Sequence, residues 1–169
     1  MKEKIINILL NSSLVRSNLV ISLGRIIRSL SKSNFVEIEG RKMFTHGNDG
    51  LALSIFKIYE PDQTEIVKKY VHEGDIVIDV GAHVGYYTLL MAQLVGKNGK
   101  VYSFEPDPIN FQLLKKSVEI NGFENVILTQ KAVSDTTEKI KLFLGDDNRA
   151  INRIYDAQLG DAQESIEVD

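Results

Sequence analysis

The fold of this chain is set by the sequence IVIDVGAHVGYYT at residues 76–88. Residues 76–80 are apolar and mostly β-branched apart from Asp79, which is typical of a buried strand in a parallel sheet. Gly81 and Gly85 allow a sharp turn after that strand, because glycine adopts backbone conformations that other residues resist. This stretch therefore predicts a strand followed by a turn that a ligand can approach closely.

Strands and helices continue to alternate after this turn. Helices are expected at residues 86–95 and 108–121, and strands at residues 100–104, 126–131 and 139–144, with one more strand beginning at residue 165. Asp107 is expected to cap the second helix, Pro108 occupies its first position, and Gly122 follows its end. Strand–helix–strand–helix–strand is the signature of a parallel sheet covered by helices, so we predict an α/β fold.

Two smaller features precede the sheet. Residues 35–39 and 42–45 are strand-like and flank Gly40-Arg41, a pattern that predicts a small β-hairpin. A helix is expected to begin at Pro61, because proline suits a first helical turn, and to end at Gly74. Its buried face is predicted to consist of apolar residues at helical spacing, namely Ile66, Val67, Tyr70 and Val71.

Residues 1–33 form a separate amphipathic segment, which divides the chain into a helical arm and a domain at residues 34–169. The arm has six basic residues against one acidic residue, a charge of +5, so the remainder carries −8 of the total of −3. Its apolar residues at helical spacing include Leu19, Leu23, Ile26 and Leu30. Such a helix either packs on its own domain or a second subunit, or lies on a membrane surface. No apolar run in it is long enough to span a bilayer.

Composition excludes several kinds of site. The chain has 169 residues, which suits one domain, and no cysteine, which excludes disulfides, thiolate zinc sites and cysteine nucleophiles. Its three histidines, at positions 46, 72 and 83, lack metal-ligand spacing, so we expect no metal site. The net charge of −3 shows no nucleic-acid signature. We expect a cytoplasmic protein, with the membrane surface as the alternative location through the arm.

The strand ends carry the residues that suggest chemistry, because ligands of such sheets bind beyond the carboxyl ends of the strands. Gly81 and Gly85 are the first and fifth residues of their turn, whereas the nicotinamide fingerprint needs glycines at its first, third and sixth positions. Glu105 ends the second strand, where a carboxylate accepts two hydrogen bonds from a ribose diol. With Asp79 at the first strand end, these acids suit a nucleoside that carries positive charge, such as S-adenosylmethionine.

A family resemblance supports this interpretation. Residues 77–88 resemble the first motif of class I S-adenosylmethionine-dependent methyltransferases. FEPDP at 104–108, Asn121-Gly122 and KAVSD at 131–135 resemble the FkbM-type family in particular, as does Tyr59-Glu60-Pro61 before the first strand. The resemblance covers residues 59–156 and implies a Rossmann-like methyltransferase sheet with S-adenosylmethionine as its cofactor.

The resemblance also implies a set of cofactor-binding residues. These are Asp79, Gly81, Ala82, His83, Gly85, Tyr86, Glu105, Pro106, Ala132 and Val133. The glycine turn would line the methionine part with Asp79 beneath it, Glu105 would hold the ribose, and Pro106 with Ala132 and Val133 would flank the adenine. The family usually has asparagine where this chain has His83. Glu60 would approach the methionine ammonium.

Each assignment has a structural alternative. Asp79 could instead cap the turn and the following helix, and Glu105 could be a solvated strand end. Asp107 is expected to be a helix cap rather than a ligand contact. His83 is expected to be a tolerated turn residue rather than a catalytic base. Of Tyr86 and Tyr87, one is expected to pack inward and the other to face the pocket or the solvent.

The function predicted from this resemblance is methyl transfer from S-adenosylmethionine, in which an acceptor oxygen attacks the methyl group in line. The family implies a hydroxyl of a sugar, glycan or natural product as acceptor, and the net charge of −3 predicts no nucleic-acid partner. A non-catalytic S-adenosylmethionine-binding module is the alternative, and the glycine spacing argues against an oxidoreductase. A complete sheet of this family has more strands than the sequence accounts for, and its acceptor-facing acidic motif has no match. We therefore expect a domain truncated at its C-terminus, catalytic residues beyond residue 169, and exposed apolar surface beside the first strand.

Overall fold

The computed structural model describes residues 35–46, 53, 57–136, 139–143 and 165–168. The expected helical arm, with its membrane or subunit contact, lies outside these residues. The described elements are β1 (Phe35–Ile38), β2 (Arg41–Phe44), α4 (Pro61–Tyr70), β3 (Ile76–Val80), α5 (Tyr86–Val95), β4 (Lys100–Phe104), α6 (Pro108–Asn121), β5 (Val126–Thr129), β6 (Ile140–Phe143) and β7 (Ser165–Val168). The predicted order of strands and helices is therefore confirmed.

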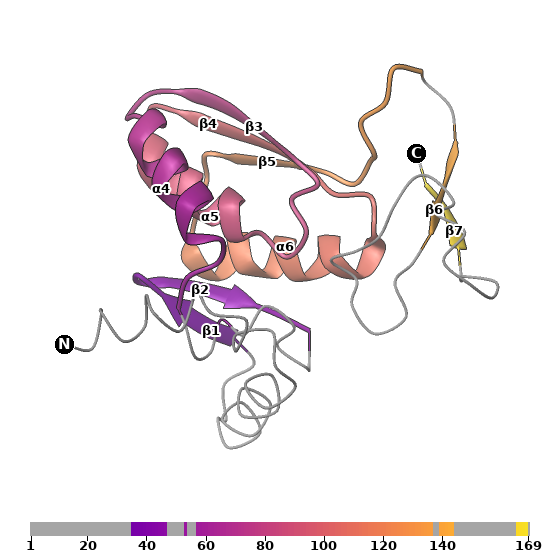
Figure 1. The fold of residues 1–169 in the computed structure, drawn as a ribbon, viewed down its shortest axis with the longest axis horizontal. Helices are drawn as coiled ribbons and strands as arrows, with labels where there is room; N and C mark the ends of the chain where they lie inside the picture. Colours follow the sequence, from indigo (N-terminus) through magenta and orange to yellow (C-terminus); the bar gives the residue numbers. More distant parts are fainter. Residues whose placement is uncertain (1–34, 47–52, 54–56, 137–138, 144–164, 169) are drawn as a thin grey trace.

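The centre of the molecule is a parallel sheet in the order β3-β4-β5. Helices α5 and α6 connect its strands and lie beneath one face of it, and the β1–β2 hairpin lies beyond α6 (Figure 1). The core between sheet and helices is built from fully buried side chains, among them Val84, Leu89, Val95, Val101 and Leu114. This arrangement confirms the predicted α/β fold with a parallel sheet and flanking helices.

Helix α6 begins and ends as its sequence predicts. Asp107 Oδ1 accepts hydrogen bonds from the backbone N–H groups of Ile109, at 2.7 Å, and Asn110, at 3.2 Å. Pro108 occupies the first turn, where no backbone donor is needed. Gly122 ends the helix in the left-handed conformation, at φ 66°. Asp107 is therefore a helix cap, as expected.

The hairpin turn is formed by Glu39 and Gly40, both with positive φ, which is the conformation that two-residue hairpin turns favour. Within the described residues, the outer edge of β2 runs along α6 rather than along another strand. Asn121 Oδ1 accepts from the Lys42 N–H at 2.9 Å, and its Nδ2 donates to the Lys42 carbonyl at 2.6 Å. Ser117 Oγ accepts from the Phe44 N–H at 2.9 Å. We call these contacts the β2–α6 seam; they satisfy backbone groups that an edge strand would otherwise expose.

Helix α4 begins at Pro61 as predicted, but two features of it were predicted wrongly. It ends at Tyr70 rather than at Gly74. Its buried face also differs, because Thr64 is 1% exposed whereas Ile66 and Tyr70 are 57% and 65% exposed. The face that packs against the core contains Thr64, Val67 and Val71, at positions i, i+3 and i+7, and the adjacent face with Ile66 and Tyr70 is open.

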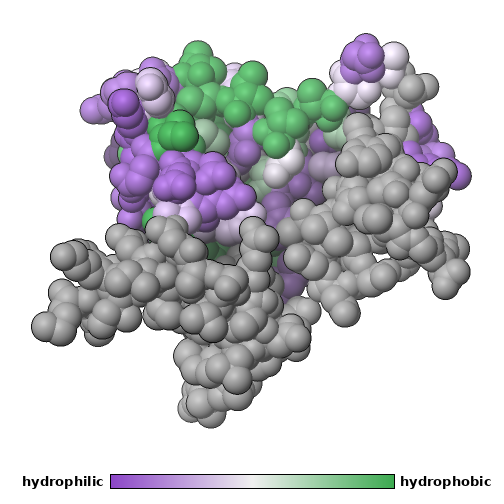
Figure 2. Space-filling view, viewed as in Figure 1, coloured by the Kyte–Doolittle hydropathy of each residue, from purple (hydrophilic) through white to green (hydrophobic). Residues whose placement is uncertain are grey.

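Strand β3 was predicted to be buried on both faces, and this is wrong for one of them. Ile76, Ile78 and Val80 are 71%, 65% and 59% exposed, because the helices cover only the opposite face of the sheet. Figure 2 shows apolar side chains gathered over this part of the sheet. These side chains are exposed on one face of β3, whereas the sequence led us to expect exposed apolar surface at the flank of the strand, which stays a prediction.

Strands β6 and β7 pair in antiparallel fashion as a separate two-stranded sheet, which confirms both predicted strands. Leu142 and Val168 are buried between them and pack with the half-buried Ala132. Strand β5 ends at Thr129, two residues earlier than predicted. None of the helices in the described part of the chain has the length and apolar character needed to cross a membrane.

Candidate functional site

The carboxyl ends of the three parallel strands meet at one edge of the sheet. Val80 is in register with Phe104, which is in register with Thr129. Beyond these pairs, the Phe104 carbonyl accepts from the backbone N–H groups of Gly81 at 2.9 Å and Ala82 at 3.0 Å. The glycine turn and the segment after β4 are thus joined directly, which brings the predicted site residues of these two strands together.

The turn at residues 81–85 uses three residues with positive φ. Gly81 has φ 77°, His83 has φ 51° and Gly85 has φ 101°. Among residues with a side chain, asparagine, aspartate and histidine adopt such a conformation most readily. The backbone thus explains why histidine can occupy a position where the FkbM-type family usually has asparagine.

The two glycines of the turn serve different purposes. A Cβ atom on Gly85 would lie 2.6 Å from Leu114 Cδ1, so Gly85 allows α5 and α6 to pack closely. A Cβ atom on Gly81 would meet nothing within 4 Å. Gly81 therefore borders open space, where a ligand can approach the backbone.

Asp79 joins the end of β3 to the first turn of α5. Its Oδ2 accepts a 2.5 Å hydrogen bond from Thr88 Oγ1, which lies 3.0 Å from Ser103 Oγ. Burial raises the pKa of Asp79, and the hydrogen bonds from Thr88 oppose that rise. The carboxylate therefore has a structural role at this junction, whether or not a ligand also meets it.

Glu105 is buried, with an exposed fraction of 5%, so the alternative of a solvated strand end is wrong. Its carboxylate accepts hydrogen bonds from the His83 N–H at 2.8 Å, the Asp107 N–H at 2.9 Å and Asn110 Nδ2 at 3.4 Å. Burial raises the pKa of Glu105, whereas these three hydrogen bonds lower it. Glu105 thus connects the glycine turn with the first turn of α6.

Two histidines lie beside this carboxylate. The rings of His46 and His83 are 5.8 Å apart, and His46 Nε2 lies 2.7 Å from Asn110 Oδ1. His83 Nε2 is buried and has no hydrogen-bond partner among the described residues. Burial, with a smaller effect of His46, lowers the pKa of His83 to about 4. His83 is therefore neutral at pH 7.

Sequence reasoning did not identify His46 or Asn110 as site residues. His46 follows the hairpin, far along the chain from the motifs, and carries no spacing signal. Asn110 had one usable signal: it is a polar residue in the first turn of α6, three residues after the Asp107 cap. Its burial, at 1% exposure, is visible only in the structure.

Three tyrosines, Tyr59, Tyr86 and Tyr87, pack together next to the turn. Tyr86 is buried and its hydroxyl lies 3.2 Å from Thr64 Oγ1, so its side chain belongs to the core. Tyr87 is half-buried and donates to Glu60 Oε2 at 3.0 Å, and burial together with Glu60 raises its pKa. The expected division between an inward and an outward tyrosine is confirmed. Glu60 is exposed and held by Tyr87, and its expected approach to the methionine ammonium stays a prediction.

The residues predicted to contact the adenine follow the ends of β4 and β5. Pro106 is half-buried beside Glu105. Ala132 packs toward β6 and β7, and Val133 is 49% exposed. Their assignment to the adenine stays a prediction.

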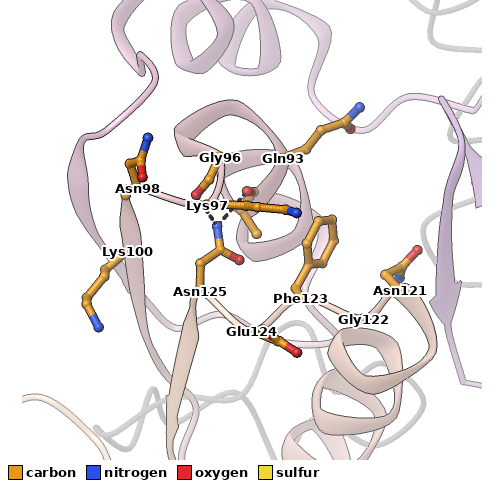
Figure 3. A pocket seen from close by; sticks show the side chains of 12 residues that line it. Gln93, Gly96, Lys97, Asn98, Lys100, Asn121, Gly122, Phe123, Glu124 and Asn125 are labelled. Carbon is orange, nitrogen blue, oxygen red and sulfur yellow. Dashed lines mark hydrogen bonds between the residues drawn. The ribbon is translucent and has the colours of Figure 1, made fainter.

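A hollow of about 640 Å³ lies at the opposite edge of the sheet (Figure 3). It is bordered by the end of α5, the start of β4 and residues 121–125. Asn125 Nδ2 closes one side by donating to the carbonyls of Ala92 and Gly96, both at 2.8 Å. This hollow is at the amino ends of the strands and so is separate from the predicted cofactor site. In the described residues, no group of three acidic or histidine side chains is placed to hold a metal ion.

Comparison with known proteins identifies the domain. The model of the TRM5/TYW2 methyltransferase domain family matches residues 53–158, a span that contains β3, β4, β5 and the strand-end residues described above. The chain belongs to this family. The TRM5/TYW2 domain confirms the predicted class I methyltransferase and, with it, S-adenosylmethionine as the cofactor. The narrower FkbM assignment is not shown by this match.

Individual relatives of this TRM5/TYW2 domain are also methyltransferases. A protein-L-isoaspartate O-methyltransferase of Methanococcoides burtonii is 38% identical over 56 residues, which cover 33% of this chain and 28% of the relative. A solved SAM-dependent O-methyltransferase of Thermotoga maritima is 26% identical with a TM-score of 0.43, covering 49% of this chain and 32% of the other. An rRNA methylase of Streptococcus thermophilus is 21% identical with a TM-score of 0.38, covering 42% and 41%. The chain spans 30% or less of the length of the first curated relatives it matches.

Proposed function

We propose that this protein is an S-adenosylmethionine-dependent methyltransferase that binds its cofactor at the carboxyl edge of the β3–β4–β5 sheet. One observation carries this proposal: the buried Glu105 carboxylate at the end of β4 is bound to the backbone of the glycine turn after β3. A nucleoside that contacts the turn would therefore meet an acid suited to its ribose. The open space beside Gly81 fits a ligand at the same place, as does His83 Nε2, which has no hydrogen-bond partner among the described residues.

Lone-pair counting shows how Glu105 would bind a ribose. An ionised carboxylate offers about four acceptor positions, and three are used here. Oε2 accepts only the His83 N–H among these contacts, so it can accept one ribose hydroxyl without further change. Oε1 already accepts from the Asp107 N–H and from Asn110 Nδ2, which hold the carboxylate in place. Glu105 would then hold a ribose hydroxyl while still fixing the turn.

The cofactor supplies an already activated methyl group, so the protein mainly has to position the two partners. In this proposal Gly81 lets the backbone approach the methionine part, and Asp79 with Thr88 keeps the turn aligned with α5. His83, neutral at pH 7, offers a hydrogen-bonding nitrogen without adding positive charge near a cationic cofactor.

We propose a hydroxyl oxygen as the methyl acceptor, in a sugar, glycan or natural product. The FkbM-type motifs FEPDP and KAVSD support this class, and two of the relatives above are O-methyltransferases. A nucleic acid is the second candidate. It is favoured by the TRM5/TYW2 family match and by the rRNA methylase among the solved structures, although the chain has a net charge of −3.

Calorimetric titration of S-adenosylmethionine into the chain tests the cofactor site. Glu105→Ala should weaken binding by about 30- to 150-fold, because it removes charge-assisted hydrogen bonds of about 2–3 kcal/mol. His72→Ala is the matched control, since the side chain of His72 is 71% exposed and lies in the turn after α4. Equal affinities for Glu105→Ala and the unsubstituted chain would refute the assignment.

A labelled cofactor separates the acceptor classes. Protein incubated with S-adenosylmethionine carrying a tritiated methyl group should label hydroxyl-bearing glycans or natural products rather than RNA. Labelled RNA would favour the second candidate. Binding of the cofactor without transfer to any acceptor would favour the non-catalytic module.

For the arm at residues 1–33, we propose contact with a membrane surface or a second subunit in a cytoplasmic protein. Its charge of +5 and its apolar stripe support this placement. Co-sedimentation with anionic vesicles, with and without residues 1–33, distinguishes membrane binding from packing on protein.

A further inference from the structure

A line of polar side chains connects the end of the hairpin to Glu105. His46 follows β2, and its Nε2 lies 2.7 Å from Asn110 Oδ1. Asn110 is buried in the first turn of α6, and its Nδ2 donates to Glu105 Oε1. The line therefore runs from His46 through Asn110 to the carboxylate that the proposed function assigns to the ribose.

Hydrogen-bond chemistry fixes the direction of this line. Asn110 Oδ1 can only accept, so His46 Nε2 must carry the hydrogen between them. The amide NH₂ group of Asn110 then faces Glu105. The reversed amide would set a carbonyl oxygen against the carboxylate, with no hydrogen between two acceptors. The carboxylate thus sets the orientation of the amide, and an Nε2 hydrogen on His46 supports that orientation from the other side.

The β2–α6 seam holds His46 in place. Along β2, Lys42 is bound to Asn121 and Phe44 to Ser117, and the next contact in this series is His46 with Asn110. The strand and the helix run in opposite directions along a single row of polar contacts. Because the seam uses backbone groups of β2, it fixes the path of the chain that leads to His46.

We propose that His46 is a positioning residue of the cofactor site, which orients the Glu105 carboxylate toward the glycine turn through Asn110. The inference rests on the proposed function, since it takes Glu105 as the ribose ligand. His46 acts through Asn110 and needs no contact with the cofactor. Its contribution is to keep one of the three hydrogen bonds that fix the carboxylate.

Titration of S-adenosylmethionine into full-chain variants tests this role. His46→Phe keeps the ring but removes both nitrogens, and it should weaken binding by about 2- to 10-fold, the effect of one hydrogen bond. His46→Gln retains an N–H donor and should restore affinity to within about 2-fold of the unsubstituted chain. His72→Phe, the same substitution at an exposed histidine, should have no effect. Unchanged affinity in a folded His46→Phe chain, checked by thermal unfolding, would overturn the proposal.

A double substitution shows whether His46 acts through Glu105. In a Glu105→Gln background, His46→Phe should cause no further loss of affinity, because the carboxylate it orients is gone. A full additional loss would mean that His46 acts elsewhere, which would also overturn the proposal.

A cofactor-free readout separates this proposal from the proposed function. The Asn110 hydrogen bond lowers the pKa of Glu105, so His46→Phe should raise that pKa, measured by carbon NMR of the carboxyl group. The other titratable groups that face Glu105, Asp107 and His83, keep their side chains in this variant, and His83 stays neutral near pH 7 because burial is the main cause of its lowered pKa. If the unsubstituted chain binds no S-adenosylmethionine, the proposed function fails while the pKa comparison still decides the role of His46. An unchanged Glu105 pKa would contradict it.

Discussion

Thr88 Oγ1 donates a 2.5 Å hydrogen bond to Asp79 Oδ2, which ties the first turn of α5 to the end of β3. A hydroxyl has one hydrogen, and Thr88 gives it to an acceptor-only carboxylate. Ser103, 3.0 Å away, must therefore donate to Thr88. These two hydrogen bonds, from Ser103 to Thr88 and from Thr88 to Asp79, connect β4 to β3 through α5, next to the proposed cofactor site.

Thr88→Val removes the donor and keeps the shape, so it should destabilise the protein by about 1–3 kcal/mol at pH 7. The pKa of Asp79 is raised in the folded protein above its ordinary value of 3.8. At a pH above the raised pKa, burial of the Asp79 charge therefore opposes folding. Below about pH 3.8 the carboxyl is protonated in the folded and unfolded states alike, and this effect disappears. Loss of the Thr88 bond raises this pKa further. Urea unfolding should therefore show a larger loss at pH 7 than at about pH 3.5, and a loss equal at both would contradict the assignment.

Cofactor affinity should fall as the solution is acidified. Burial raises the pKa of Glu105 above its ordinary value of 4.5, and a protonated carboxyl has fewer acceptor positions for ribose hydroxyls. Affinity should be constant above the raised pKa and decline as pH falls through it. Titrations from pH 8 down to the ordinary carboxyl pKa of 4.5 measure this decline, and Glu105→Gln should bind weakly with a smaller pH dependence. A profile shared by both proteins would assign the titration to another group.

Alanine substitutions should separate the two glycines of the turn. Gly81→Ala puts a side chain at φ 77° beside open space, so it should cost about 1–2 kcal/mol of stability and obstruct the cofactor. Gly85→Ala adds to this strain a contact of 2.6 Å with Leu114, so its stability loss should be clearly larger. Thermal unfolding and cofactor titration on both variants check this, and equal losses of stability would contradict it.

Polar substitution on the open face of β3 should cost little stability. Ile78 is 65% exposed, so Ile78→Thr should change the free energy of unfolding by no more than about 0.5 kcal/mol. Val101→Thr is the matched control on the neighbouring strand, because Val101 is fully buried and a hydroxyl there should cost about 1–3 kcal/mol. Denaturant unfolding of the two variants measures both effects. A large loss for Ile78→Thr would show that this face is covered in solution.

The features that the sequence predicted best are those fixed by local chemistry. Asp107, Pro108 and Gly122 mark the ends of α6 through capping and allowed backbone angles, and they do so in the structure. The sharp turn at Gly81 and Gly85 was likewise expected, because both residues have the positive φ that glycine permits. The edge at which Asp79 and Glu105 lie could also be predicted, because parallel strands place their carboxyl ends together.

The features that the sequence did not predict depend on what lies next to each surface. An apolar strand looks the same whether one or both of its faces are covered, so the exposure of Ile76 and Ile78 could not be read from it. Tyr70 has helical spacing with the core-facing residues of α4 but lies on the open face. The pairing of His46 with Asn110 joins residues 64 positions apart and follows no motif.

The β2–α6 seam sets an order of events in folding. Its contacts between Lys42 and Asn121 join residues 79 positions apart, so they require a large loop to close before they form. A two-stranded hairpin is at best marginally stable alone, and β2 gains its outer partners only once α6 exists. The hairpin, although synthesised before the sheet, is therefore expected to dock after it, and the proposed cofactor site receives His46 as a late step in folding.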